Sequence, residues 1–103
     1  MMKKRNRIII KGNVQRVGFR HQAGELANKL GIVGKAVYIN HDILIEAEGN
    51  EQELNQFLDW CRKGPEGCCI EDFEMTDLPL LNQEVFEIVH GVLFSKELQV
   101  VEA

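Results

Sequence analysis

The sequence has few of the residues from which disulfide frameworks and metal sites are built. It contains three cysteines and three histidines among 103 residues. The cysteine count is odd and Cys68 and Cys69 are adjacent, so no disulfide framework is indicated. A zinc site needs ligands at regular spacing, which the histidines do not supply, so we expect no metal ion. Unpaired cysteines suit a reducing compartment, and the sequence therefore predicts a cytoplasmic protein.

The sequence also lacks long apolar runs and an excess of basic residues. No apolar run approaches the roughly 20 residues that span a bilayer, and no signal peptide is recognisable, so we expect no membrane association. Sixteen acidic and twelve basic residues give a net charge of −4. This balance argues against nonspecific binding of nucleic acid, which depends on lysine and arginine. The hydrophobic content of 45% is typical of a globular protein, and the length predicts one domain over residues 1–103.

Hydrophobic spacing predicts two helices and five strands. The expected strands cover about 7–12, 35–39, 43–48, 70–76 and 85–89, and the helices about 19–30 and 50–64. Gly31 is expected to end the first helix, whereas Asn50 and Glu53 are expected to form a capping box at the start of the second. The order βαββαβ, with a short fifth strand, predicts a ferredoxin-like α+β sandwich. Two helices would cover one face of a mainly antiparallel sheet.

Residues 12–20, with the sequence GNVQRVGFR, connect the first strand to the first helix. The first amides of a helix lack intrahelical partners, and the helix dipole adds partial positive charge there. Converging loop amides can form a nest for phosphate oxygens, and the guanidinium of Arg20 can bind two of them. The sequence therefore predicts a phosphate site. Its expected members are Asn13, Val14, Gln15, Arg16, Val17, Gly18, Phe19 and Arg20.

The same stretch resembles the acylphosphatase signature glycine-x-valine-glutamine-glycine-valine-x-phenylalanine-arginine, with Arg16 in place of the usual glycine. The likeness continues through several further motifs. These are Leu30-Gly31, Gly34, Glu46-Ala47-Glu48-Gly49, Trp60, Gly64-Pro65 and Phe86-Glu87-Ile88. The resemblance covers about residues 5–90, so residues 91–103 are expected to form a C-terminal extension of undetermined structure.

The resemblance implies an activity. Acylphosphatases hydrolyse the carboxyl-phosphate bond of small acyl phosphates to a carboxylate and inorganic phosphate, with neither cofactor nor phosphoenzyme. In the family an asparagine of the second strand places the attacking water, and here that position is Tyr38. Asn40 lies two residues farther along the same side of an extended strand and is a candidate substitute. A turn residue is the simpler interpretation of Asn40.

Three classes of function therefore stay open. The first is a hydrolase of small acyl phosphates with Arg20 and Tyr38 or Asn40 as catalytic residues. The second is a relative that binds anions without cleaving them, and the third is an interaction domain. The expected partner is a small acyl phosphate or inorganic phosphate, and not nucleic acid. The acyl group and the oligomeric state are left open, because the loop contacts only the phosphoryl end of a substrate.

Overall fold

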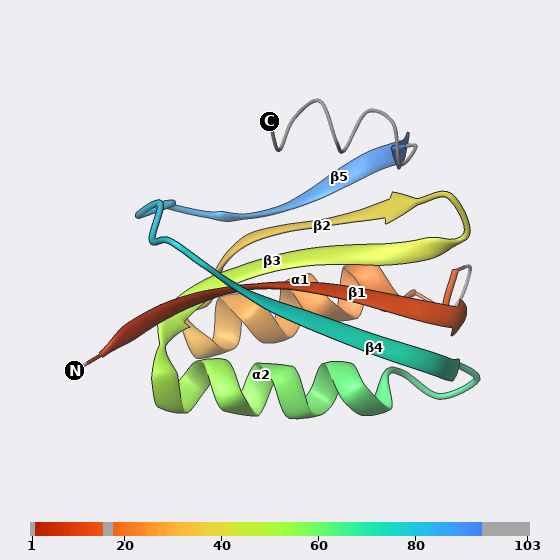
Figure 1. Cartoon of the computed structure of the whole chain (residues 1–103), viewed down its shortest axis with the longest axis horizontal. Coiled ribbons are helices and arrows are strands. Elements are labelled where there is room, and N and C mark those ends of the chain that lie inside the picture. The colour runs from red at the N-terminus through yellow and green to blue at the C-terminus, as the bar shows by residue number, and fades with distance from the viewer. Residues whose placement is uncertain (1, 16–17, 94–103) are drawn as a thin grey trace.

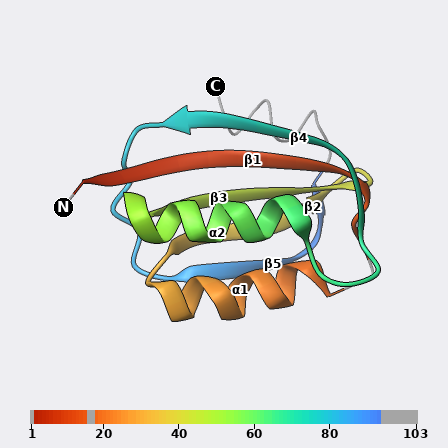
Figure 2. The same ribbon diagram turned by 90° about the horizontal axis from the view of Figure 1, so that it is seen from below.

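The computed structural model describes residues 2–15 and 18–93. Five strands form one sheet in the order β4-β1-β3-β2-β5, and two helices lie on one of its faces (Figures 1 and 2). The pairing of β2 with β5 is parallel and the other pairings are antiparallel. This is the predicted ferredoxin-like α+β sandwich. The elements are β1 (Lys3–Asn13), α1 (Phe19–Leu30), β2 (Val33–Ile39), β3 (Asp42–Asn50), α2 (Glu51–Lys63), β4 (Cys69–Leu78) and β5 (Phe86–Leu93).

The main core lies between the helices and the sheet. Alternate residues of β1 and β3 face it, including Ile8, Ile10 and Ile45, because successive side chains of a strand point to opposite faces. The helices contribute apolar stripes that include Phe19 and Phe57. Cys61 also belongs to this core, as its place on the helical stripe predicts. Its burial raises the pKa of the thiol, so that the thiol stays protonated at neutral pH.

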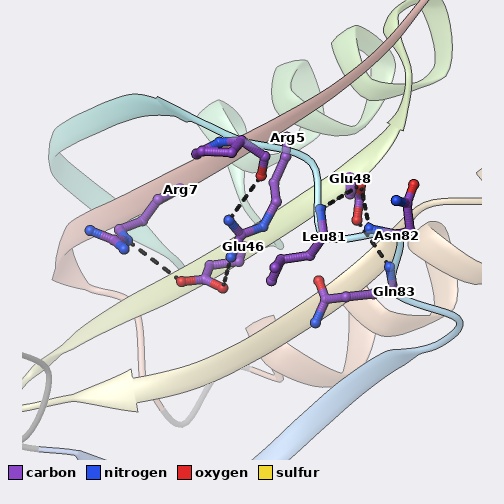
Figure 3. A network of polar contacts seen from close by, with 8 residues as sticks. Arg5, Arg7, Glu46, Glu48, Leu81, Asn82 and Gln83 are labelled. Atoms are coloured by element: carbon purple, nitrogen blue, oxygen red, sulfur yellow. Dashed lines mark hydrogen bonds and ion pairs between the residues drawn. The ribbon is translucent and has the colours of Figure 1, made fainter. Parts of the chain in front are cut away.

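The opposite face of the sheet carries a buried charge network (Figure 3). A second apolar cluster, formed by Val37, Ile39 and Leu44, lies on the same face. Glu46 accepts a hydrogen bond of 2.7 Å from Nη2 of Arg5, and its other oxygen lies 3.6 Å from Nε of Arg7. Nη1 of Arg5 donates to the carbonyl of Pro79, in the loop after β4. Arg5 and Glu46 are both almost fully buried. An isolated charge would be costly there, but each charge has an opposite partner.

Glu48 holds the loop between β4 and β5 (Figure 3). Its carboxylate accepts hydrogen bonds from the backbone N–H groups of Leu81, Asn82 and Gln83, at 3.1, 2.9 and 3.1 Å. Burial alone would raise the pKa of Glu48. The three N–H donors and the charge of Arg5 outweigh it, so the pKa lies below its ordinary value. Glu48 is therefore an internal anion that fixes the approach to β5.

One of the two expected helix caps is present in the structure. Gly31 ends α1 in the left-handed conformation, with φ of 72°, and its N–H donates to the carbonyls of Ala27 and Asn28, as predicted. The prediction of a capping box at the start of α2 is wrong. Asn50 is the N-cap residue but makes no side-chain capping bond within the part of the chain that the structure describes. The N–H of Glu51 instead donates to the carbonyl of Met2 at 2.9 Å.

The last strand is longer than the sequence predicts. Hydrophobic spacing indicates an end near Val89, but β5 continues to Leu93. The additional pairs are explained by the parallel neighbour, because Tyr38 and Ile39 of β2 pair with Val92 and Leu93 after a shift in register. Residues 91–93 of the expected extension therefore belong to the sheet, and residues 94–103 lie outside the described residues.

Candidate functional site

The connection from β1 to α1 is fixed first by the backbone at Gly12. A bulge interrupts the pairing of β1 with β4 between Lys11 and Gly12, and Gly12 has φ of 132°. A Cβ at this position would collide with the carbonyl oxygen of Cys69, so only glycine is accommodated. Two residues later the side chain of Val14 is fully buried in the main core. The strand therefore enters the loop in one defined direction.

Gln15 joins this loop to the turn between β2 and β3. Its Nε2 donates to the carbonyl of Asn40 at 3.2 Å and to the carbonyl of Asp42 at 3.0 Å. Asn40 has φ of 55°, the left-handed conformation that asparagine tolerates in turns. The side-chain amide of Gln15 thus ties together two segments that are about 25 residues apart in sequence.

The start of α1 has features that favour the binding of an anion. The first intrahelical bond runs from the N–H of Gln22 to the carbonyl of Gly18, at 3.0 Å, so the amides before Gln22 have no intrahelical acceptor. Gly18 is the N-cap residue, with φ of 75°, and has no side chain with which to cap them. The first turn contains no acidic residue. Anions bind helix N-termini of this kind. The side chain of Phe19 is buried and packs edge-on against Trp60, which anchors the turn.

Arg20 reaches from this first turn toward β2 and β5. Its Nη1 donates to the carbonyl of Val89 at 2.7 Å. Its Cζ lies 3.7 Å from the centroid of the Tyr38 ring, which places the guanidinium over the ring face. The hydrogen bond to Val89 uses Nη1, and Nε and Nη2 form the other edge of the guanidinium. Nε is buried without a hydrogen-bond partner among the described residues. Such an edge can bind two oxygens of one anion.

A cavity of about 310 Å³ lies beside Arg20 and is lined by Gly18, Arg20, His21, Tyr38 and Ile88. Its volume lies at the lower end of the range of about 300–1,000 Å³ that is usual for sites of small ligands. The helix start supplies backbone N–H groups, Arg20 supplies a permanent positive charge, and Ile88 supplies apolar surface. This arrangement can bind a small anion that has an organic substituent.

The structure separates the predicted phosphate-site residues into groups. Gly18, Arg20 and Tyr38 line one cavity. Val14 and Phe19 bury their side chains, so only their backbones can face a ligand, and Asn13 is the last paired residue of β1. Asn40 lies in the adjoining turn. Arg16 and Val17 lie outside the described residues.

Sequence reasoning missed the contribution of β5. The carbonyl of Val89 holds Arg20, and the side chain of Ile88 lines the cavity. A backbone carbonyl leaves no signal in the sequence, because every residue has one. His21 also lines the cavity, and its spacing in the sequence gave no sign of this position. Its neighbour on the helix, Glu25, lies 2.7 Å from its Nε2.

The described residues show neither a cluster of metal ligands nor a helix able to cross a membrane. Within residues 2–15 and 18–93, no group of three or more histidine, cysteine, aspartate or glutamate side chains could hold a metal ion. Neither α1 nor α2 has the length and apolar content that crossing a membrane requires.

A family model, curated relatives and solved structures that are named acylphosphatase match this chain. The chain matches the family model described as Acylphosphatase over residues 6–88. It is similar to an acylphosphatase from Synechococcus sp. (strain CC9311), with 33% identity over 88 residues that cover 84% of this chain and 98% of the other. It is also similar in structure to the acylphosphatase from Bacillus subtilis, with a TM-score of 0.80 and 31% identity over 86% of this chain and 100% of that one. A further likeness is to full-length HypF in its phosphate- and nucleotide-bound form, with a TM-score of 0.84 and 25% identity over 91% of this chain. That match covers only 12% of the HypF chain.

Proposed function

Because the chain belongs to the acylphosphatase family, we propose that it hydrolyses the carboxyl-phosphate bond of small acyl phosphates. The observation that supports this most strongly is the position of Arg20 beside a helix start that has no side-chain cap among the described residues, with Arg20 and Gly18 lining one small cavity. Each feature alone is common in proteins. Together they supply two kinds of donor, backbone amides and a guanidinium edge, to the same volume.

In the proposed complex the phosphoryl group lies at the start of α1. Amides of Gly18 and the first helical residues donate to some of its oxygens, and the Nε–Nη2 edge of Arg20 donates to others. A phosphoryl oxygen on Nε would satisfy a buried donor that otherwise lacks a partner among the described residues. These donors are held in place before the ligand arrives, so they can stabilise negative charge as it shifts in the transition state.

The proposed reaction is a direct displacement by water. The water oxygen bonds to phosphorus while the bond between phosphorus and the carboxylate oxygen breaks. The carboxylate leaves with the electron pair of that bond, and a proton of the water is released to solvent or to the phosphate product. A carboxylate is a weak base, so it departs without a strong general acid. Placement of the water and the phosphoryl group then accounts for most of the catalysis.

Two interpretations of the site differ in whether it contains a group that places the attacking water. Tyr38 occupies the position of the family's asparagine, and its ring lies against the guanidinium of Arg20. Asn40 lies in the turn that Gln15 holds beside the phosphate loop. If neither residue orients water, the same site binds acyl phosphates or inorganic phosphate without cleaving them. The presence of tyrosine at position 38 is the observation that favours this second candidate function.

One experiment separates these functions. Hydrolysis of benzoyl phosphate is followed for the purified protein, for Arg20→Ala and for Arg62→Ala, and calorimetry measures the binding of inorganic phosphate to each. Arg62 is a matched control because its guanidinium lies 4.4 Å from the centroid of another ring, that of Phe73, away from the cavity.

Turnover that is lost in Arg20→Ala and kept in Arg62→Ala would support the hydrolase. Phosphate binding without turnover, again dependent on Arg20, would support the anion-binding domain. A protein that neither cleaves benzoyl phosphate nor binds phosphate would contradict both functions.

A further inference from the structure

We propose that Tyr38 is a positioning residue for Arg20, whose guanidinium plane is held by the face of the Tyr38 ring. The inference rests on the proposed function, because it concerns how the phosphate-binding arginine is oriented. It assigns Tyr38 a role different from that of the asparagine it replaces, since Tyr38 would act through Arg20 and not on the attacking water.

Two contacts together define the orientation of the guanidinium. The ring of Tyr38 lies 3.7 Å from Cζ and restricts tilting of the guanidinium plane. The hydrogen bond of 2.7 Å from Nη1 to the carbonyl of Val89 restricts rotation within that plane. Arginine has a long side chain with considerable rotamer freedom, and either contact alone would leave one of these motions open. With both in place, the Nε–Nη2 edge has one direction.

The Tyr38 ring that contacts Arg20 is held rigidly. Tyr38 lies in β2, which is paired on both sides, with Ile43 of β3 opposite it on one side and Val92 of β5 on the other. Its side chain packs against the main core and is only partly exposed. Sites built on paired strands are held more accurately than sites on loops. Both contacts to Arg20 therefore come from adjacent strands of one sheet, and they move together with it.

The identity of residue 38 also agrees with this role. An asparagine side chain is short and has no aromatic face, so it cannot support a guanidinium by cation–π attraction. The departure from the family pattern thus creates the contact that orients Arg20. Replacing Tyr38 by asparagine distinguishes the two roles. The value of kcat/KM rises if tyrosine only obstructs the water, and falls if tyrosine holds Arg20.

The test uses Tyr38→Phe, Tyr38→Leu and Tyr38→Asn in the full chain. The kcat and KM for benzoyl phosphate and the inhibition constant of inorganic phosphate are measured for each. Phenylalanine keeps the ring face, so Tyr38→Phe should retain at least about half of kcat/KM. Leucine and asparagine lack the ring, so both variants should lose about 3- to 30-fold in kcat/KM and bind phosphate more weakly by a similar factor.

Two further measurements separate positioning from a purely structural effect. In the Arg20→Lys background, Tyr38→Leu should cause much less additional loss of phosphate affinity than in the unmutated protein, because the stacked guanidinium is already gone. The Nε–H signal of Arg20 in a proton–nitrogen spectrum, assigned by its disappearance in Arg20→Lys, should carry a ring-current shift. The shift should persist in Tyr38→Phe and vanish in Tyr38→Leu.

The outcomes distinguish this inference from the proposed function. An active protein in which Tyr38→Leu keeps full phosphate affinity, or in which Tyr38→Asn gains activity, overturns the positioning role alone. Equal losses in Tyr38→Phe and Tyr38→Leu overturn it as well, because the hydroxyl and not the ring would then matter. A protein that shows the ring-current shift but neither binds nor cleaves overturns both the proposed function and the positioning role.

Discussion

Replacing Glu48 by glutamine should reveal how much one carboxylate contributes to the stability of the protein through the loop between β4 and β5. In the native structure Oε2 accepts two backbone hydrogen bonds and Oε1 accepts one, all from the loop that leads into β5. A glutamine side chain has nearly the same shape but only one acceptor oxygen. If that oxygen takes the place of Oε2, the new NH₂ group faces the N–H of Gln83. One backbone donor then loses its acceptor in a partly buried position.

The magnitude follows from these contacts. A hydrogen bond to a charged group contributes about 1.5–3 kcal/mol, and a buried donor left without an acceptor costs a similar amount. The other two bonds become weaker because the charge is lost. We therefore expect Glu48→Gln to lower the free energy of unfolding by about 2–4 kcal/mol. For a domain of this size, that loss corresponds to a fall in Tm of roughly 10–25 °C.

Urea unfolding followed by tryptophan fluorescence measures this loss, with Glu74→Gln as the matched control. Glu74 lies 3.5 Å from Lys11 in an exposed ion pair, so its neutralisation should cost less than about 1 kcal/mol. If Glu48→Gln were no less stable than Glu74→Gln, the assignment of Glu48 as an internal anion for the loop would be refuted.

The pH dependence supplies a second readout of the same residue. The pKa of Glu48 lies below its ordinary value of 4.5 in the folded protein, so the stabilisation is complete above that value. It should be lost as the pH falls through the lower, folded pKa. The unfolding free energy of Glu48→Gln should therefore depend less steeply on pH below about 4.5 than that of the unmutated protein.

Three further substitutions test other contacts. Gln15→Ala should change the unfolding free energy by no more than about 1 kcal/mol. It should lower kcat/KM about tenfold, because the loop before α1 is released from the turn between β2 and β3, and unchanged kinetics would contradict this role. Gly34→Ala should cost at least about 3 kcal/mol in a urea titration, because a Cβ would collide with the carbonyl oxygen of Glu46, and a loss below 1 kcal/mol would contradict the close approach. Arg5→Ala should cost about 3–5 kcal/mol in the same titration, because Glu46 stays buried with only the longer contact to Arg7, and a loss below about 1 kcal/mol would contradict the buried pair.

The sequence was sufficient for features that depend on local patterns. The bounds of α1 could be predicted because an apolar stripe with helical spacing ends at Gly31, which adopts the left-handed conformation. The family resemblance could be recognised because its signature at residues 12–20 is contiguous, and the family model matches residues 6–88. The order of helices and strands along the chain followed from the hydrophobic spacing.

Features that depend on distant partners could not be predicted in this way. Glu48 alternates with apolar residues along β3 and would ordinarily face water, but its backbone donors lie about 33 residues later in a loop without a recognisable motif. The N–H of Glu51 at the start of α2 likewise finds its acceptor in a distant backbone carbonyl, that of Met2, which has no sequence signature. The contact of Arg20 with Val89 joins residues 69 positions apart through a carbonyl group, which has no sequence signature.

The parallel pairing of β5 with β2 has a consequence for how the protein acquires activity during folding. Arg20 belongs to the first helix, but the carbonyl that orients it belongs to the strand that follows every other described element. Contacts between residues so far apart in sequence form late, because the long loop between them must be closed at a cost in chain entropy. A nascent chain can therefore form α1, the hairpin of β2 and β3, and α2 while its arginine is still unoriented. Substrate binding should appear only when β5 joins the sheet, so binding competence would report completion of the fold.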